Sequence, residues 1–212
     1  MSSANSDVTV VPVHAAWADG PSWNKVTEEL QRKGFPVVAQ IPLTSFTEDV
    51  AVLKRVLLRQ KGPIVLAGHS YGGAVITVAA AANPNVKALV YVAAIVPDEG
   101  ETGGDVLRRV SPHASAPQLQ PDATASETAL MSAAQKPISV KCLRERMTKP
   151  AWKEKPSWFL IAEKDIMLSP ETQRFTAARM KSKIVSLPVD HHPLASRPDA
   201  VTDLITMAAT TA

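Results

Sequence analysis

One serine in the chain stands in a local sequence that could make it a nucleophile. Gly68-His69-Ser70-Tyr71-Gly72 fits the pattern G-x-S-x-G, in which a serine occupies a tight turn between a strand and a helix. Side chains two positions to either side would collide in such a turn, so glycine is required at both places. Five-residue matches also arise by chance, and the alternative is a glycine-rich turn whose serine has no chemical role.

A serine hydroxyl attacks a carbonyl group only when a base removes its proton. The expected base is a histidine held by a carboxylate, and where the serine lies on a G-x-S-x-G turn between a strand and a helix the chain order is serine, acid, histidine. His14 and His69 precede the serine, and His113 lies where no strand is predicted to hold it. His191 and His192 follow the last predicted strand, so this order points to one of these two.

The acid is expected just beyond the strand predicted at residues 156–162, where Glu163 and Asp165 are the candidates. Asp165 lies in the turn proper, and Ser169-Pro170 opens the next helix. We therefore predict Asp165 as the acid. A turn or helix-capping role is the alternative for this aspartate, and a turn role is the alternative for Asp190.

These side chains need a fold that brings them together at one edge of a sheet. The hydrophobic pattern predicts such a fold. Apolar runs, most of them rich in β-branched residues, predict strands at residues 8–13, 35–41, 63–67, 86–94, 156–162 and 182–188. Helical spacing of apolar residues predicts helices at residues 24–33, 47–60, 74–82, 170–180 and 199–209. This alternation is typical of an α/β fold with a mostly parallel sheet and helices on both faces.

The alternation breaks in one stretch, residues 98–150, which is rich in Ser, Ala, Pro and Gln. It contains two short helix-like pieces, near residues 127–135 and 140–147. We expect a core made of residues 1–97 and 151–212, with residues 98–150 inserted as a small cap or lid. Such a lid would influence substrate choice, and its shortness and few aromatic residues favour an open pocket.

Composition excludes several classes of function. The 212 residues are 45% hydrophobic and 20% charged, with a net charge of +3, which is ordinary for a globular protein. The densest group of lysines and arginines, at residues 141–155, is interrupted by Glu145 and Glu154, which favours a solvated face over a nucleic-acid site. The single cysteine, Cys142, cannot form an intrachain disulfide, and no spacing of cysteines predicts a zinc site.

No apolar run free of charge reaches the ~18 residues of a membrane span, and residues 1–7 lack the apolar core of a signal peptide. We therefore expect a cytoplasmic protein with a small-molecule substrate and neither a membrane nor a nucleic-acid partner. The sequence leaves a homodimer open.

Four segments together make this sequence resemble the α/β-hydrolase superfamily, in particular its small bacterial esterase-like members related to plant methylesterases and hydroxynitrile lyases. The resemblance covers nearly the whole chain, and GHSYGG and the histidine segment are its most specific parts. The four segments are VHAAWADGPSW (13–23), GHSYGG (68–73), PAWKEKPSWFLIAEKD (150–165) and DHHPLASRPDAVTDL (190–204).

The resemblance implies which histidine is the base. Relatives read D-H-x-P-x-x-S-x-P, which puts the catalytic histidine on His191 and leaves His192 in the variable position. The resemblance likewise puts the acid on Asp165, which completes a triad with Ser70.

The resemblance also implies an oxyanion hole made of two backbone N–H groups. They fall on Tyr71, directly after the nucleophile, and on Ala16, in the loop after the first strand. Relatives have His-Gly-x in that loop, whereas this chain has Ala15 in place of the glycine. Its Cβ would crowd the hole or narrow the pocket. His14, which precedes it, is expected to order the loop.

The implied activity is hydrolysis of a small or medium carboxylic ester through an acyl-enzyme intermediate, with no cofactor and no metal. One alternative is a C–C lyase like the hydroxynitrile lyases, whose sequences have a hydroxyl residue and a lysine where this chain has Ala15 and His192. Both departures count against the lyase. The other alternative is a non-catalytic receptor for a small ligand on a hydrolase scaffold.

Overall fold

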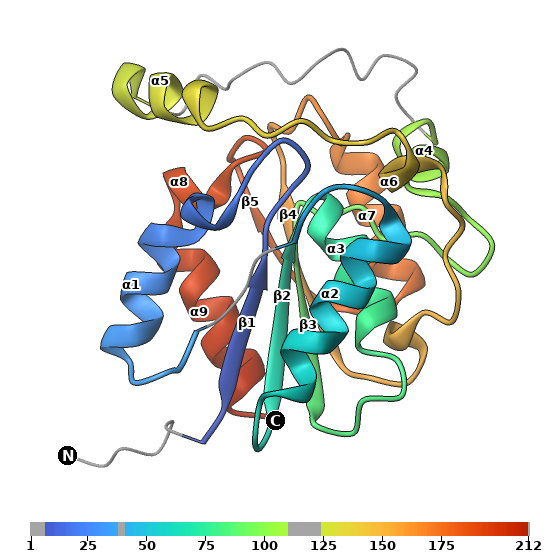
Figure 1. Ribbon diagram of the computed structural model, residues 1–212. Coiled ribbons are helices and arrows are strands. Elements are labelled where there is room, and N and C mark those ends of the chain that lie inside the picture. The colour runs from blue at the N-terminus through green and yellow to red at the C-terminus, as the bar shows by residue number, and fades with distance from the viewer. Residues whose placement is uncertain (1–6, 38–40, 110–123, 212) are drawn as a thin grey trace.

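A five-stranded parallel sheet forms the centre of the protein (Figure 1). The computed structural model describes residues 7–37, 41–109 and 124–211. Neighbouring strands pair in parallel and follow chain order across the sheet, so their C-terminal ends meet at one edge. The strands are β1 (Thr9–Val13), β2 (Ile64–His69), β3 (Val86–Val92), β4 (Ser157–Ala162) and β5 (Lys183–Leu187).

Helices cover both faces of this sheet, which confirms the predicted fold class (Figure 1). On one face α1 (Asn24–Arg32) and α9 (Pro198–Ala209) bury apolar side chains against the strands. On the other face lie α2 (Phe46–Leu58), α3 (Tyr71–Ala79) and α7 (Pro170–Arg179). β1 to β4 are buried almost throughout, as expected for parallel strands between two helical layers.

The shorter elements lie mostly around the C-terminal edge of the sheet. They are η1 (Gly20–Trp23), α4 (Gly103–Leu107), α5 (Ala125–Ala133), α6 (Lys141–Arg144), η2 (Ala151–Lys153) and α8 (Pro193–Ser196). α5 lies beyond this edge, at the top of the view in Figure 1. α6 is shorter than the helix-like piece predicted at residues 140–147, because the backbone turns extended at Glu145 and the next residue bridges to Thr102.

The prediction of a strand at residues 35–41 is wrong for the residues of this range that the structure describes, 35–37 and 41. Residues 35–37 touch β1 through one bridge between Val37 and Val10, and the Val10 N–H donates to the Pro36 carbonyl at 2.9 Å. Residues 38–40 lie outside the described residues. The run is as apolar and β-branched as a strand, but Pro36 has no N–H to donate to a ladder.

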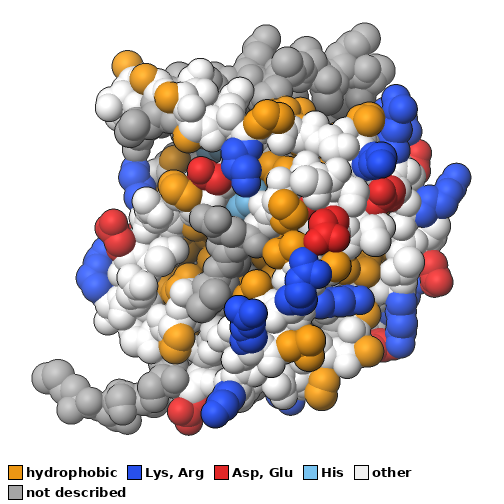
Figure 2. Space-filling view, viewed as in Figure 1, with side chains coloured by type: hydrophobic (Ala, Val, Ile, Leu, Met, Phe, Trp, Pro, Cys, Tyr) orange, Lys and Arg blue, Asp and Glu red, His pale blue; other side chains and the backbone are white. Residues whose placement is uncertain are grey.

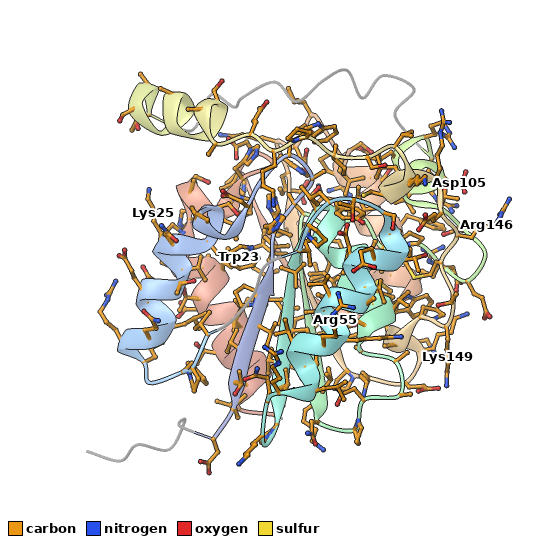
Figure 3. The ribbon with its side chains drawn as sticks, in the orientation of Figure 1. Trp23, Lys25, Arg55, Asp105, Arg146 and Lys149 are labelled. Atoms are coloured by element: carbon orange, nitrogen blue, oxygen red, sulfur yellow. The ribbon has the colours of Figure 1, made fainter. Side chains whose placement is uncertain are left out.

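The two ends of the segment predicted as a cap lie against each other. The Gly100 N–H donates to the Met147 carbonyl at 3.0 Å, and the Met147 N–H donates to the Glu101 carbonyl at 2.8 Å. Lys153 and Asp98 form an ion pair of 2.7 Å at the same place. Figure 3 shows Arg146 close to Asp105 of α4 on this side of the molecule. A segment inserted into a core must leave and re-enter it at neighbouring points, and these contacts are of that kind. The division into core and cap at residues 98–150 stays a prediction. Residues 110–123 lie outside the described residues.

Charged side chains of both signs are interspersed on the face shown in Figure 2. Ion pairs among the described residues include that of Arg55 with Glu48 and that of Arg197 with Asp199. Among the described helices, none combines the length and the apolar character needed to cross a membrane.

The turn between β2 and α3 depends on two glycines that pack directly against backbone. A Cβ added at Gly72 would lie 2.4 Å from the carbonyl oxygen of Val13 in β1, and one added at Gly68 would lie 2.7 Å from backbone atoms of Gly72. Because these neighbours are backbone atoms inside the sheet and helix, they have little room to move. The start of α3 therefore packs closely on the end of β1.

We expect Gly72→Ala to lower the free energy of unfolding by about 2–3 kcal/mol or more, because the added methyl group overpacks this contact. Urea unfolding followed by circular dichroism measures the change. Gly34→Ala is the matched control: Gly34 has a φ of +86° but nothing within 4 Å of an added Cβ, so only the conformational cost of about 1 kcal/mol applies. Equal losses in the two variants would contradict the close packing of α3 on β1.

Candidate active site

Ser70 lies in a strained backbone conformation between β2 and α3. Its φ is +50° and its ψ is −119°, a region that residues other than glycine rarely occupy and that clusters at functional sites. The surrounding backbone holds it there: the Ser70 N–H donates to the Val92 carbonyl at 3.1 Å, and the Ile95 N–H donates to the Ser70 carbonyl at 3.0 Å. The serine is thus fixed at the C-terminal edge of the sheet.

His191 and Asp165 lie on two other loops at the same edge and contact each other. Asp165 follows β4, and His191 follows β5. The His191 Nδ1 lies 2.6 Å from the Asp165 Oδ2, and both residues are buried. Because a carboxylate oxygen accepts, Nδ1 carries the hydrogen in this contact, and in the tautomer that it selects the lone pair is on Nε2. The structure therefore joins these two predicted residues, and Glu163, the other candidate acid, instead pairs with Arg174 at the surface.

Asp165 is held by hydrogen bonds to both of its oxygens. The N–H groups of Met167 and Leu168 donate to Oδ1 at 2.8 and 2.9 Å. Gln173 of α7 donates from Nε2 to Oδ2 at 2.8 Å. With His191, these donors satisfy a carboxylate that is almost inaccessible to water, which removes the main cost of burying it.

Gln173 was missed by the sequence analysis. Its side chain is fully buried and also accepts from the Ala162 N–H at 3.0 Å and donates to the Leu168 carbonyl at 2.8 Å. It therefore ties the end of β4 to the turn that carries Asp165. The sequence contains no motif for this role, because a glutamine inside a helix is usually exposed.

Ser70 and His191 line one cavity of about 440 Å³. Within the described chain, no hydrogen bond joins the serine hydroxyl to the histidine ring. Such contacts are often long in ligand-free sites and shorten when substrate binds. The structure thus brings the serine and the histidine to one cavity and the histidine and the aspartate into contact.

The loop after β1 and the start of α1 form much of the cavity wall. Their contribution is mostly apolar, and it consists of Ala15, Ala16, Trp17, Ala18, Asp19, Pro21, Ser22, Asn24 and Lys25. Lys25, labelled in Figure 3, donates to the Ala195 carbonyl of α8 at 3.1 Å. Met167, Leu194 and Ala195 complete the apolar part of the wall.

Part of the segment predicted as a lid lies at the cavity. Of residues 98–150, only Ala134 and Gln135 are described as lining the cavity. They follow α5 and are held in place because the Lys136 N–H donates to the Trp17 carbonyl at 3.0 Å. The described wall is therefore set largely by the loop after β1.

The two predicted donors of the oxyanion hole occupy different positions around the serine. Tyr71 is the first residue of α3, and Ala16 lies in the cavity wall. Ala15, which stands where relatives have glycine, is 6% exposed and also lines the cavity. Its methyl group therefore reduces the space at this wall. The oxyanion roles of Tyr71 and Ala16 stay predictions.

His14 contacts the backbone on both sides of its ring. Its Nδ1 lies 2.9 Å from the Ala15 carbonyl oxygen, and its Nε2 lies 3.1 Å from the Ile41 carbonyl oxygen and 3.4 Å from the Ile41 backbone nitrogen. A neutral ring carries one N–H and donates to one of the two carbonyl oxygens. Burial lowers the pKa of His14, which favours this neutral form. These contacts hold the loop that carries Ala15 and Ala16.

The side chain of Tyr71 joins a buried polar cluster behind the serine. Its hydroxyl donates to the Asp49 Oδ2 at 2.7 Å, the Leu43 N–H donates to the Asp49 Oδ1 at 2.8 Å, and the Cys142 thiol lies 3.6 Å from Oδ2. Burial raises the pKa of the Asp49 carboxyl, and burial raises the pKa of the Cys142 thiol to about 11. Cys142 is therefore a buried thiol and a poor nucleophile.

Three imidazole rings pack together at the base of the cavity. The His69 and His191 ring centroids are 5.1 Å apart, and the His192 ring stands edge-on to both, at 5.8 and 5.4 Å. Burial, together with the neighbouring His191, lowers the pKa of His192 to about 3 and holds the pKa of His69 well below its ordinary value. In the described part of the chain, no group of three or more His, Cys, Asp or Glu residues is arranged to hold a metal ion.

Comparisons with known proteins agree with this architecture. A model of the alpha/beta hydrolase family matches residues 10–204. A carbendazim-hydrolysing esterase from a Nocardioides species is 30% identical over 125 residues, which cover 51% of this chain and 49% of that protein. The match thus spans about half the length of this relative.

Solved structures of two hydrolases superimpose on nearly the whole chain. A pyrethroid hydrolase from Sphingobium faniae has a TM-score of 0.77 at 22% identity, covering 96% of this chain and 98% of that one. An extracellular α/β-hydrolase from a Paenibacillus species, which shares structural and functional homology with tobacco salicylic acid binding protein 2, has a TM-score of 0.78 at 18% identity, covering 95% and 98%. At these identities the likeness shows the fold alone, and it confirms the predicted fold class.

We expect Gln173→Leu to lower the free energy of unfolding by about 2–4 kcal/mol, because it leaves the Ala162 N–H and the Leu168 carbonyl buried without partners. Equilibrium urea unfolding measures this loss. Glu171→Gln, at an exposed position of the same helix, is the control and should change stability by less than about 0.5 kcal/mol. A Gln173→Leu protein as stable as the control would show that Gln173 does not hold the Asp165 turn.

Proposed function

The chain belongs to the alpha/beta hydrolase family, and from this premise we propose that it is a serine hydrolase that cleaves a carboxylic ester through an acyl-enzyme intermediate. The observation that carries the proposal is the 2.6 Å contact between the His191 Nδ1 and the Asp165 Oδ2, together with the cavity that His191 shares with Ser70. A histidine oriented by a buried carboxylate, beside a serine on a strained turn, is the arrangement that activates a hydroxyl.

In the proposed first step, the His191 Nε2 takes the proton of the Ser70 hydroxyl as its oxygen attacks the ester carbonyl. Asp165 keeps the ring in the tautomer that presents Nε2 and stabilises the imidazolium that forms. The same imidazolium then protonates the leaving alcohol. Water, deprotonated by His191, attacks the acyl-serine, and release of the acid restores the Ser70 hydroxyl.

The tetrahedral intermediates carry a negative charge on the former carbonyl oxygen. In the proposal, the backbone N–H groups of Tyr71 and Ala16 donate to this oxygen. The position of Tyr71 at the N-terminus of α3 supports this role, because the helix dipole favours negative charge there. The Asp49 carboxylate holds the Tyr71 side chain away from the cavity, so only its backbone would serve the reaction.

The cavity supports a small or medium substrate. Its volume is about 440 Å³, and most of its described wall is apolar, which suits the acyl chain or alcohol of an uncharged ester. The name of the Nocardioides relative, a carbendazim-hydrolysing esterase, is in keeping with ester-type chemistry. A C–C lyase is disfavoured because Ala15 and His192 stand where the lyases have a hydroxyl residue and a lysine.

We expect the protein to hydrolyse p-nitrophenyl esters of short acyl chains, and Ser70→Ala to lower kcat by about 10³-fold or more. Release of p-nitrophenolate measures turnover across a chain-length series. A fluorophosphonate should label the wild-type protein at Ser70, shown by peptide mass spectrometry, and should leave Ser70→Ala unlabelled. Undiminished turnover in Ser70→Ala would rule out this nucleophile, and a folded wild type without turnover would favour a lyase or a ligand receptor.

We expect His191→Ala to lower kcat by about 10³-fold or more, because the serine loses its base. His192→Ala, one residue along, should cost at most about tenfold, the size of one lost substrate contact. The same p-nitrophenyl assay compares the two variants, and thermal unfolding by circular dichroism checks that both are folded. The reverse order of losses would place the base on His192.

A further inference from the structure

One nitrogen at the base of the cavity has no function in the proposed mechanism. His192 lines the cavity together with Ser70 and His191, and its ring stands edge-on to the His191 ring at 5.4 Å with an interplanar angle of 88°. A group this close to the proposed base is within reach of a substrate positioned for attack.

Two imidazoles at the cavity, those of His69 and His192, have a buried Nδ1 without a partner, and they differ in what their Nε2 contacts. Ser70 and His191 act in the proposed chemistry, and the His69 Nε2 lies 2.7 Å from the His191 carbonyl oxygen. In His192, the backbone N–H donates to Asp190 at 2.7 Å, and the ring Nδ1 is buried without a partner. The His192 Nε2 also bonds to no other described residue, but unlike Nδ1 it is not fully buried. It is therefore open to the cavity that His192 lines.

The surroundings of the ring indicate which hydrogen-bonding role Nε2 can take. A hydrogen on the buried Nδ1 would be a donor with nothing to accept it, which folded proteins avoid. The hydrogen therefore belongs on Nε2, which makes this atom a donor. The ring is neutral, because burial and the neighbouring His191 lower its pKa to about 3. A neutral donor suits an uncharged acceptor oxygen.

The cavity around this donor is mostly apolar, with Ala16, Met167 and Leu194 in its wall. A substrate oxygen in such surroundings loses its bonds to water and regains one only where a donor meets it. A donor that faces the apolar part of the wall therefore discriminates between esters that differ by a single oxygen at that place.

We propose that His192 is a specificity-determining residue whose Nε2–H donates to a neutral oxygen that the substrate carries two to four bonds from the scissile carbonyl carbon. The substrate class is then an ester with an alkoxy, keto or hydroxyl oxygen beside the reacting group, on either its acyl or its alcohol side. This inference rests on the proposed esterase function and deepens it.

Two isosteric pairs of esters test the proposal, and each pair exchanges one CH₂ for one oxygen. p-Nitrophenyl methoxyacetate against p-nitrophenyl butyrate probes the acyl side. 2-Methoxyethyl acetate against butyl acetate, followed by pH-stat titration of the released acid, probes the alcohol side. For each pair, the measured quantity is the kcat/KM of the oxygen-containing ester divided by that of its partner, and comparing variants cancels the intrinsic reactivity of the esters.

We expect this ratio to fall about threefold to tenfold in His192→Met for one of the two pairs, the size of one lost hydrogen bond, and the pair that responds identifies the side. His192→Gln, which keeps an N–H donor on a chain of similar length, should restore at least part of the ratio. Gln135→Met is the matched control, because it removes an amide elsewhere in the cavity wall, and it should leave both ratios within about twofold.

Ratios unchanged in both His192 variants for both pairs would overturn the proposal while leaving the esterase function intact. An equal fall in His192→Met and His192→Gln would also overturn it, because a change of shape would then explain the effect. If the wild type hydrolysed none of the four esters, or if Ser70→Ala hydrolysed them equally well, the proposed function would fail and this inference with it.

Discussion

The arrangement of the site depends on the reversal of the chain at one residue, Ser70. The strand β2 ends at His69 and the helix α3 begins at Tyr71, so Ser70 alone makes the turn. This is sterically allowed only because the flanking glycines let backbone approach backbone: a Cβ at Gly72 would meet the carbonyl oxygen of Val13 at 2.4 Å. The strain at Ser70 is thus maintained by packing between α3 and β1, which lies outside the turn itself.

A second constraint is the burial of a carboxylate beside a histidine. Asp165 is buried, and it is stable there because Met167, Leu168, Gln173 and His191 all donate to it or contact it. An unpaired carboxylate at this depth would be costly. The bonds that satisfy it also fix the direction of the His191 ring, so in this fold the stability of the turn and the orientation of the proposed base have one cause.

The wall of the cavity also depends on the loop after β1, which has an unusual backbone conformation at one residue. Trp17 has a φ of +58°, and its carbonyl accepts from Lys136, which connects the loop after β1 to the segment that follows α5. His14 fixes the start of the same loop through Ala15 and Ile41. The cavity is therefore shaped by segments far apart in the chain. At its base the rings of His69 and His192, whose pKa values burial lowers, add polar groups without adding charge.

The sequence by itself determined the fold class, because strand and helix periodicity and the glycines around Ser70 are local properties. It predicted five of the six strands in their places and failed at residues 35–41, where the described part makes only one bridge to β1 although its residues suit a strand. The motif named Ser70, the turn after a predicted strand named Asp165, and chain order narrowed the histidine to His191 or His192, of which the resemblance implied His191. Only the tertiary structure brought Gln173 to Asp165, Asp49 to Tyr71 and the open Nε2 of His192 to the cavity. These contacts join residues on different elements, and whether a polar side chain is buried with partners depends on how the elements pack rather than on its neighbours in the chain.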